Sequence, residues 1–290
     1  MERVVFVCDN FADKFIGGAE LSLQAHIDTC PFPFTLVKSA EFNPKKFNPK
    51  KDLLVFGNYA NLDREHFGDI ATRFKYVIEE CDYKYCKYRS SHKHRAMESK
   101  DCDCHLTAYG LDIFAFMRGA AWMFWKSERQ RYEYTRLFGD PAGVWPDEFG
   151  GTIVGGVFSD EILDYILSLK ETPKQDRAFV LYSGSWIKGY NNAATYCRTN
   201  GLKQHTVGNI PYRDCLKEMA TCSTLVYLPN GFDVSCRMVT EAKILGLKII
   251  TNNLVQHVTE PWFTGSDEDR VAFLRSRNPE FWRVVGGLMA

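Results

Sequence analysis

Two acidic residues eight positions apart, Asp233 and Glu241, are the strongest chemical signal in the sequence. The apolar run 224–229 before them is typical of a buried parallel strand, and 238–245 has the pattern of a helix. Ligands of parallel sheets bind at the carboxyl ends of the strands, and the start of a helix offers free backbone N–H groups to an anion. Both carboxylates are therefore expected to face a bound ligand.

A lysine is expected beyond the end of a second strand. The stretch 177–189 begins as an apolar strand, breaks into a small-residue loop with Ser185, and delivers Lys188 at a helix start. A diphosphate there would meet both the ammonium group and free backbone donors. Arg237, beside the helix that carries Glu241, is a second candidate cation.

Paired glycines mark the first loop of the chain. Gly17 and Gly18 follow a strand pattern at 3–8 and stand at the mouth of a helix. Glycine in such a place lets a ligand approach the backbone closely. The G-x-G-x-x-G spacing of a dinucleotide-binding loop is missing, which excludes that class of site.

These motifs, in this order, resemble the signature of family 4 glycosyltransferases of the GT-B fold, in a compact form for which a viral type is one alternative. The resemblance implies that Asp233 orients the donor sugar and that Glu241 holds the ribose of a nucleoside diphosphate sugar. It also implies that Lys188, with Arg237, draws on the leaving diphosphate. Transfer would then proceed with retention and without a catalytic metal.

The same resemblance implies a pocket for the rest of the nucleotide. The stretches 205–209 and 212–220 are similar to the strand and short helix that line the base, which places Asn209 in that pocket. Ser185 and the paired glycines would lie against the phosphates.

The alternation of strand and helix patterns predicts an α/β protein with two doubly wound Rossmann-like domains and a cleft between them. Residues 1–155 are expected to form the acceptor-side domain and 156–267 the domain that binds the nucleotide sugar, with a linker near 150–156. As the resemblance implies, a helix at 268–290 would pack back on the first domain. Strands of the first domain are expected at 3–8, 35–38, 53–56, 76–79 and 122–125.

A segment rich in Cys and His follows the fourth expected strand. Its members are Cys81, Cys86, His92, His94, Cys102, Cys104 and His105. Such residues at short spacings invite a tetrahedral zinc ion, for which Cys81, Cys86, Cys102 and Cys104 are the candidate ligands. The alternative is a polar loop with free or packed thiols. Any zinc here would be structural.

The same segment is basic and aromatic. Its cations are Lys84, Lys87, Arg89, Lys93, Arg95 and Lys100, and its aromatic residues include Tyr83, Tyr85 and Tyr88. We expect Lys87, Arg89, Lys93 and Arg95 to contact an anionic acceptor, with DNA that carries hydroxymethylated bases as the leading candidate. A glycan or a lipid-linked acceptor is the alternative, and a solvated face is the plainer interpretation.

Composition and length agree with a globular protein. The chain has 290 residues, 45% of them hydrophobic, with 36 basic and 36 acidic side chains, which suffices for two modest cores and excludes disordered and collagen-like classes. No apolar run of roughly eighteen residues is present, so no membrane span is expected. The first residues lead straight into a strand, so we expect a cytoplasmic protein, in the host cytoplasm if viral.

We therefore expect a glycosyltransferase that moves a hexose or pentose to a hydroxyl acceptor. Two departures from the family pattern keep a catalytically inactive binding protein as an alternative: Asp233 stands where the family usually has Glu, and Ser183 where it commonly has Arg. An epimerase or a phosphorylase with the same fold is a third alternative.

Overall fold

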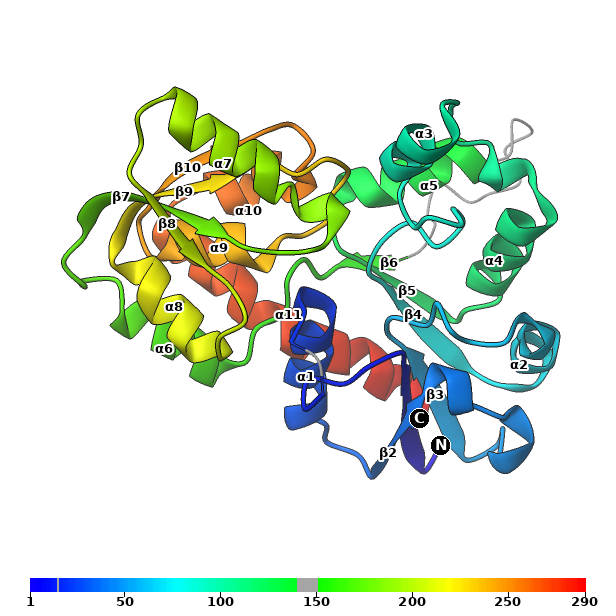
Figure 1. The fold of residues 1–290 in the computed structure, drawn as a ribbon. Helices are drawn as coiled ribbons and strands as arrows, with labels where there is room; N and C mark the ends of the chain where they lie inside the picture. The colour runs from blue at the N-terminus through cyan, green and yellow to red at the C-terminus, as the bar shows by residue number, and fades with distance from the viewer. Residues whose placement is uncertain (15, 140–150) are drawn as a thin grey trace. The chain divides into compact units, whose positions relative to one another are not determined.

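Two parallel β-sheets carry the fold, one in each of two units (Figure 1). The computed structural model describes residues 1–14, 16–139 and 151–290. Unit 1 comprises Met1–Phe158 and Ser276–Ala290, and unit 2 comprises Ser159–Arg275. The expected linker region begins at Gly150, which lies outside the described residues.

The sheet of unit 1 has six parallel strands in the order β2-β1-β3-β4-β5-β6. Strands β1, β3 and β4 are buried almost throughout, because helices cover both faces, and this explains their nearly continuous apolar sequences. The five strands expected here are confirmed to within one residue at each end. The strands are β1 (Arg3–Cys8), β2 (Phe34–Lys38), β3 (Asp52–Phe56), β4 (Tyr76–Glu80), β5 (Trp122–Trp125) and β6 (Gly151–Ile153).

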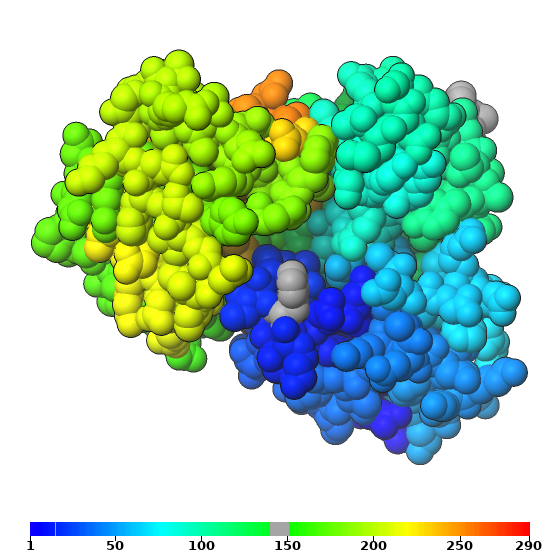
Figure 2. Space-filling model, in the orientation of Figure 1, coloured from blue at the N-terminus to red at the C-terminus, as the bar shows by residue number. Residues whose placement is uncertain are grey.

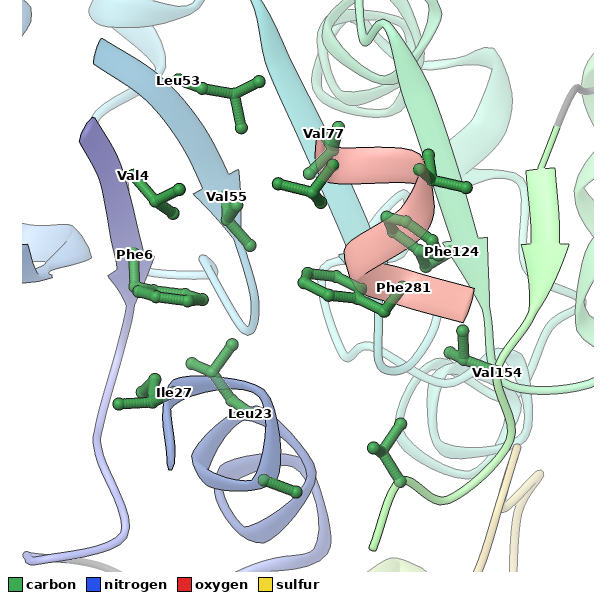
Figure 3. Close-up of a cluster of buried hydrophobic side chains, with 14 of the residues drawn as sticks. Val4, Phe6, Leu23, Ile27, Leu53, Val55, Val77, Phe124, Val154 and Phe281 are labelled. Atoms are coloured by element: carbon green, nitrogen blue, oxygen red, sulfur yellow. The ribbon is translucent and has the colours of Figure 1, made fainter. Parts of the chain in front are cut away.

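Helices α1 (Gly18–Asp28) and α11 (Asp267–Met289) supply side chains to one face of this sheet. Figure 3 shows Leu23 of α1 and Phe281 of α11 among the strand side chains of this core. The Phe281 ring lies 4.6 Å from that of Phe124 on β5. The last turns of the chain thus complete the core that its first strand begins.

Helices α2 (Phe67–Arg73) and α4 (Ala108–Arg118) cover the opposite face. The ring of Phe116 on α4 stacks on Tyr76 of β4 at 4.9 Å and on Phe67 of α2 at 4.3 Å. Aromatic stacking of this kind adds about 0.5–1.5 kcal/mol to the burial of the rings.

A long excursion separates β4 from α4. It runs over residues 81–107 and contains one short helix, α3 (Ser91–Glu98). Helix α5 (Glu128–Phe138) follows β5, and the Ser127 side chain caps it by accepting a hydrogen bond from the Gln130 N–H, a role that serine commonly takes before a helix.

The sheet of unit 2 has four parallel strands in the order β10-β9-β7-β8. Helix α7 (Tyr190–Thr199) packs Ala193 and Cys197 against Ala178, Val180 and Val226 of the central strands. Among the described residues, no helix combines the length and the apolar character needed to cross a bilayer. The strands are β7 (Gln175–Leu181), β8 (Gln204–Val207), β9 (Cys222–Tyr227) and β10 (Lys248–Thr251), and the helices are α6 (Asp160–Ser168), α7 (Tyr190–Thr199), α8 (Tyr212–Ala220), α9 (Arg237–Ile244) and α10 (Pro261–Thr264).

Candidate functional site

The loops that follow β7, β9 and β10 are tied to one another by hydrogen bonds. The Asn230 backbone N–H donates to the Ile187 carbonyl at 3.0 Å, and its side-chain amide donates to the Trp186 carbonyl at 2.7 Å. The Asn252 amide donates to the Pro229 carbonyl at 2.9 Å. Three neighbouring strands therefore present one cross-linked set of loops at their carboxyl ends, where parallel sheets bind ligands.

Gly189 sets the direction of the loop that carries Lys188. Its φ of +64° lies in the left-handed region, and a Cβ there would come within 1.9 Å of the Leu228 carbonyl oxygen. Only glycine accepts both constraints without displacing the loop after β9. Lys188 ends a 3-10 turn, and α7 begins at Tyr190.

Lys188 and Asp233 form an ion pair in these loops. The Lys188 Nζ lies 2.9 Å from Asp233 Oδ2, and the Tyr227 hydroxyl donates to the same oxygen at 2.5 Å. Burial raises the pKa of Asp233, but the Lys188 charge and the two hydrogen bonds outweigh it, so the pKa is lowered and the carboxylate stays ionised. The Lys188 side chain is 37% exposed, so a ligand can reach the ammonium group.

Glu241 belongs to a second polar group, on α9. The Tyr212 hydroxyl donates to Glu241 Oε1 at 2.6 Å, and the Arg237 Nε lies 3.6 Å from the same oxygen. Arg237 also donates to the Tyr212 hydroxyl at 3.1 Å. Burial raises the pKa of Glu241, and Arg237 and Tyr212 oppose that rise. The structure thus brings Lys188 to Asp233 and Arg237 to Glu241.

Two further candidates lie on loops of unit 2. Ser185 is exposed, and its backbone N–H donates to the Ser183 hydroxyl at 3.2 Å. Asn209 is exposed after β8 and has a φ of +55°.

The paired glycines belong to unit 1. Gly17 caps α1 with a φ of −127°, which any residue adopts, and its carbonyl accepts the Leu21 N–H at 2.9 Å. Gly18 is the first residue of α1, and its carbonyl accepts the Ser22 hydroxyl. The backbone itself therefore does not require glycine at position 17.

A buried histidine near Asp233 was missed by the sequence analysis. His257 is fully buried, its Nε2 lies 3.2 Å from the Thr240 hydroxyl, and its ring stacks on Trp262. Burial lowers the pKa of His257 to about 4, against the opposing charge of Asp233. It is therefore neutral at neutral pH. No motif surrounds it, so only its tertiary contacts reveal it.

The basic segment of unit 1 differs from the expected free surface. Lys84 is 1% exposed and lies 3.3 Å from both Glu80 and Asp82. Arg89 forms an ion pair with Asp82 and donates to the Asn58 side chain at 2.7 Å. These two cations neutralise the buried Glu80 and the half-buried Asp82.

The rest of this segment is also partly engaged. Lys87 pairs with Glu98 at 2.9 Å, and Arg95 pairs with Asp101. Tyr83 and Tyr85 are buried, with 1% and 4% of their surfaces exposed, and are therefore closed to base stacking. Both rings pack against Tyr134, so the interpretation of these two aromatic residues as part of an acceptor surface is wrong.

The structure gathers part of the expected metal set. Cys86, His94, Cys102 and Cys104 place their ligand atoms within 4.8 Å of one another. Cys81 lies outside this group, and its thiol donates to the Glu79 carbonyl at 3.5 Å. The fourth member of the candidate metal-binding group is therefore His94, and not Cys81 as the sequence predicted.

Comparisons with known proteins agree on the architecture. No family model and no curated relative matches the sequence. Solved structures of family 4 glycosyltransferases match nearly the whole chain. Sucrose-phosphate synthase from Thermosynechococcus elongatus has a TM-score of 0.61 and 11% identity, covering 100% of this chain and 97% of its own. HepE from Anabaena, in complex with UDP and glucose, has a TM-score of 0.55 and 11% identity, covering 99% of this chain and 100% of its own.

A third structure extends the likeness. AviGT4, a glycosyltransferase involved in avilamycin A biosynthesis, has a TM-score of 0.52 and 9% identity, covering 97% of this chain and 93% of its own. At such identities the likeness concerns the fold, and it agrees with the two parallel sheets of six and four strands. The chain has the GT-B fold of these glycosyltransferases.

Proposed function

We propose that the chain is a retaining glycosyltransferase that moves a sugar from a nucleoside diphosphate sugar to a hydroxyl acceptor. The observation that carries the proposal is the Lys188–Asp233 pair at the carboxyl edge of the unit 2 sheet, in a chain with the GT-B fold. HepE, which shares this fold, has been solved with UDP-glucose, so UDP-glucose is the first donor to test.

In the proposed reaction, Lys188 binds and stabilises the leaving diphosphate. Lys188 stands two residues before α7, and the first N–H groups of a helix, which lack intrahelical partners, can bind an anion. Negative charge on the diphosphate grows as the glycosidic bond breaks, so a cation placed there stabilises the transition state more than the ground state. Asp233, ionised and buried, would accept hydrogen bonds from sugar hydroxyls. The acceptor hydroxyl attacks the same face of the sugar as the diphosphate leaves, its proton passes to the departing phosphate oxygen, and no step uses a metal ion.

Arg237 takes a different part in this proposal from the one that the family resemblance implied. It is 6% exposed and engages both Glu241 and Tyr212. We therefore assign Arg237 to holding Glu241 in place. Glu241 would bind the ribose, in competition with the Tyr212 hydroxyl that now occupies one of its oxygens.

The acceptor in this proposal is a compound with a free hydroxyl group. DNA with hydroxymethylated bases loses part of its support, because Lys84 and Arg89 already form ion pairs with Glu80 and Asp82. A glycan or a lipid-linked hydroxyl could accept the sugar from the same donor. Acceptor arrays that include modified DNA distinguish these classes.

The test is turnover with a panel of nucleotide sugars. We expect slow release of free nucleoside diphosphate without an acceptor and faster release with one. The product should keep the anomeric configuration of the donor sugar, as read by nuclear magnetic resonance. Lys188→Ala should lose this release. Failure of every donor to bind in calorimetry would overturn the proposal.

A binding protein without transfer activity is the second candidate. Both carboxylates are satisfied by internal partners, and Ser183 supplies no charge where the family commonly has Arg. This candidate predicts calorimetric binding of a nucleotide sugar with no release of diphosphate in any acceptor mixture.

A further inference from the structure

Three sulfurs and one imidazole nitrogen meet inside the 81–107 excursion of unit 1. The His94 Nδ1 lies 3.3 Å from the Cys104 Sγ and 3.9 Å from the Cys86 Sγ, and the Cys102 Sγ completes the group. Cys86, His94 and Cys104 are buried, and Cys102 is half-buried. No two of the ten cysteines, all of which are described, form a disulfide.

The distances between these sulfur and nitrogen atoms fit tetrahedral coordination of one metal ion. With Zn–S bonds of about 2.3 Å and a Zn–N bond of about 2.0 Å, tetrahedral angles place sulfur and nitrogen about 3.5 Å apart and two sulfurs about 3.8 Å apart. The two measured sulfur–nitrogen distances stand on either side of this value. An ion at the centre would therefore need only small side-chain shifts.

Burial closes most of the group to solvent. Cys86, His94 and Cys104 are each at most 4% exposed. The Cys86 thiol donates to the Ser90 carbonyl at 3.4 Å, and this proton would leave when a metal ion binds the thiolate.

The histidine also has a suitable outer partner. With Nδ1 turned to the sulfurs, the buried His94 Nε2 makes no hydrogen bond to any described residue. The nearest carboxylate, Asp103 Oδ1, lies 3.9 Å away. Metal-bound histidines commonly donate their second N–H to such a carboxylate, so a small movement of Asp103 completes the arrangement.

We propose that Cys86, His94, Cys102 and Cys104 bind one structural zinc ion. Four protein ligands leave no open position for water or substrate, so this ion takes no part in transfer. Three thiolates with one imidazole favour zinc over the hard ions magnesium and calcium, which prefer oxygen ligands.

The small amount of regular structure in the 81–107 excursion explains why an ion would be needed there. The excursion has 27 residues and one helix of 8 residues, too little regular structure to bury a core of its own. Cys86 precedes α3, His94 is on it, and Cys102 and Cys104 follow it. One ion would join both ends of α3 at the surface of unit 1, where Figure 2 shows this segment in cyan.

The site is also anchored to the body of unit 1. A Cβ on Gly110 would lie 2.0 Å from the Cys104 carbonyl oxygen. Glycine at this position therefore lets the turn at Cys104 pack directly on the first turn of α4. The end of the excursion that carries Cys102 and Cys104 is thereby fixed to α4, one of the helices that cover the sheet. The zinc proposal does not depend on the proposed transfer activity.

The first experiment measures metal content in the whole chain. Protein made in zinc-supplemented medium and purified without chelator should carry about one zinc per chain. His94→Ala and Cys102→Ser should lose most of it. The matched controls His92→Ala and Cys81→Ser change the same residue types in the same segment and should keep it.

The second experiment needs no variant to fold. Reduced wild-type protein, freed of zinc and given Co²⁺, should develop the visible absorption of tetrahedral cobalt with thiolate ligands. Trypsin should cut the zinc-free protein between Cys86 and Cys102, where the chain offers Lys87, Arg89, Lys93, Arg95 and Lys100. Added zinc should protect these bonds.

Clear outcomes would overturn the proposal. One is wild-type protein with ten titratable thiols that carries no zinc and binds no Co²⁺ after reduction. Another is a native disulfide among Cys86, Cys102 and Cys104, detected as the loss of two hydrogen masses. Equal zinc in all four variants would move the ion to other ligands.

Discussion

The ion pair between Lys188 and Asp233 matters for ligand recognition and adds little to the stability of the fold. A pair with one partner 37% exposed contributes little to folding, because solvent screens the attraction. The glycine that fixes their loop and the tyrosine that completes the Asp233 contacts nevertheless hold them in one geometry. Such positioning of a reachable cation and a buried carboxylate is what recognition of a charged donor needs.

Replacing Lys188 tests the leaving-group role at this scale. We expect Lys188→Ala to lower kcat by about 10²–10³ and to change KM much less, because the lost charge acts mainly in the transition state. Steady-state kinetics with the active donor measure both. Lys203→Ala, on the exposed surface of the same unit, should leave kcat unchanged. A rise in KM alone would remove Lys188 from the chemical step.

His257 makes a prediction about pH. Its folded pKa of about 4 lies below the unfolded value of about 6.5, so protonation favours the unfolded chain. The free energy of unfolding contributed by this group is therefore complete above about pH 6.5 and is lost as the pH falls to about 4, by roughly 3 kcal/mol.

Denaturant titrations across that range check this sign. His257→Gln should flatten the fall in stability between pH 6.5 and 4, while His66→Gln, at a half-buried position in unit 1, should not. The same slope in wild type and His257→Gln would show that other groups cause the acid loss.

At the scale of elements, the site depends on how the loop after β7 packs on the loop after β9. Gly189 has a left-handed backbone and no room for a Cβ, while Gly201, at the end of α7, has a similar φ of +63° and meets no described atom within 4 Å. The two glycines therefore separate backbone strain from steric contact.

We expect Gly201→Ala to cost about 1–2 kcal/mol from the left-handed conformation alone. Gly189→Ala should cost more than that and should also weaken donor binding, because the Leu228 carbonyl must move and takes the Asp233 loop with it. Thermal unfolding and calorimetry with the nucleotide sugar measure the two effects. Equal losses of stability and intact binding in both variants would show that the close approach is unimportant.

At the scale of the whole molecule, each unit has a core of its own. The unit 1 core joins α1 and the end of α11 to the six-stranded sheet, and Phe281 is fully buried between His26 and Phe124. The unit 2 core lies between α7 and the central strands of the four-stranded sheet.

Phe281→Ala should therefore destabilise unit 1 by about 3–5 kcal/mol through loss of burial and the cavity left behind. Hydrogen exchange of the intact protein should show faster exchange in β1, β3 and β4. Amides of β7 and β9 should keep their protection. Val226→Ala, in the unit 2 core, should give the opposite distribution, and uniform loss in both variants would mean that the cores unfold as one.

The fold class and most elements follow from local patterns. Continuous apolar runs mark strands buried on both faces, and turns with small residues mark their ends, so the expected strands of unit 1 agree closely with the structure. Spacing alone also puts an acid and a lysine in loops beyond the carboxyl ends of strands β9 and β7. These features depend on neighbours in sequence.

The partner of each charged or sulfur-bearing side chain was decided only by the tertiary structure. Sequence spacing does not show that Tyr212 covers Glu241 or that Lys84 is buried against acids. Nor does it show that His94, and not Cys81, joins the three cysteines. Such pairings depend on burial and on distances between segments remote in sequence, since a polar group is buried only where the surrounding fold supplies its partner.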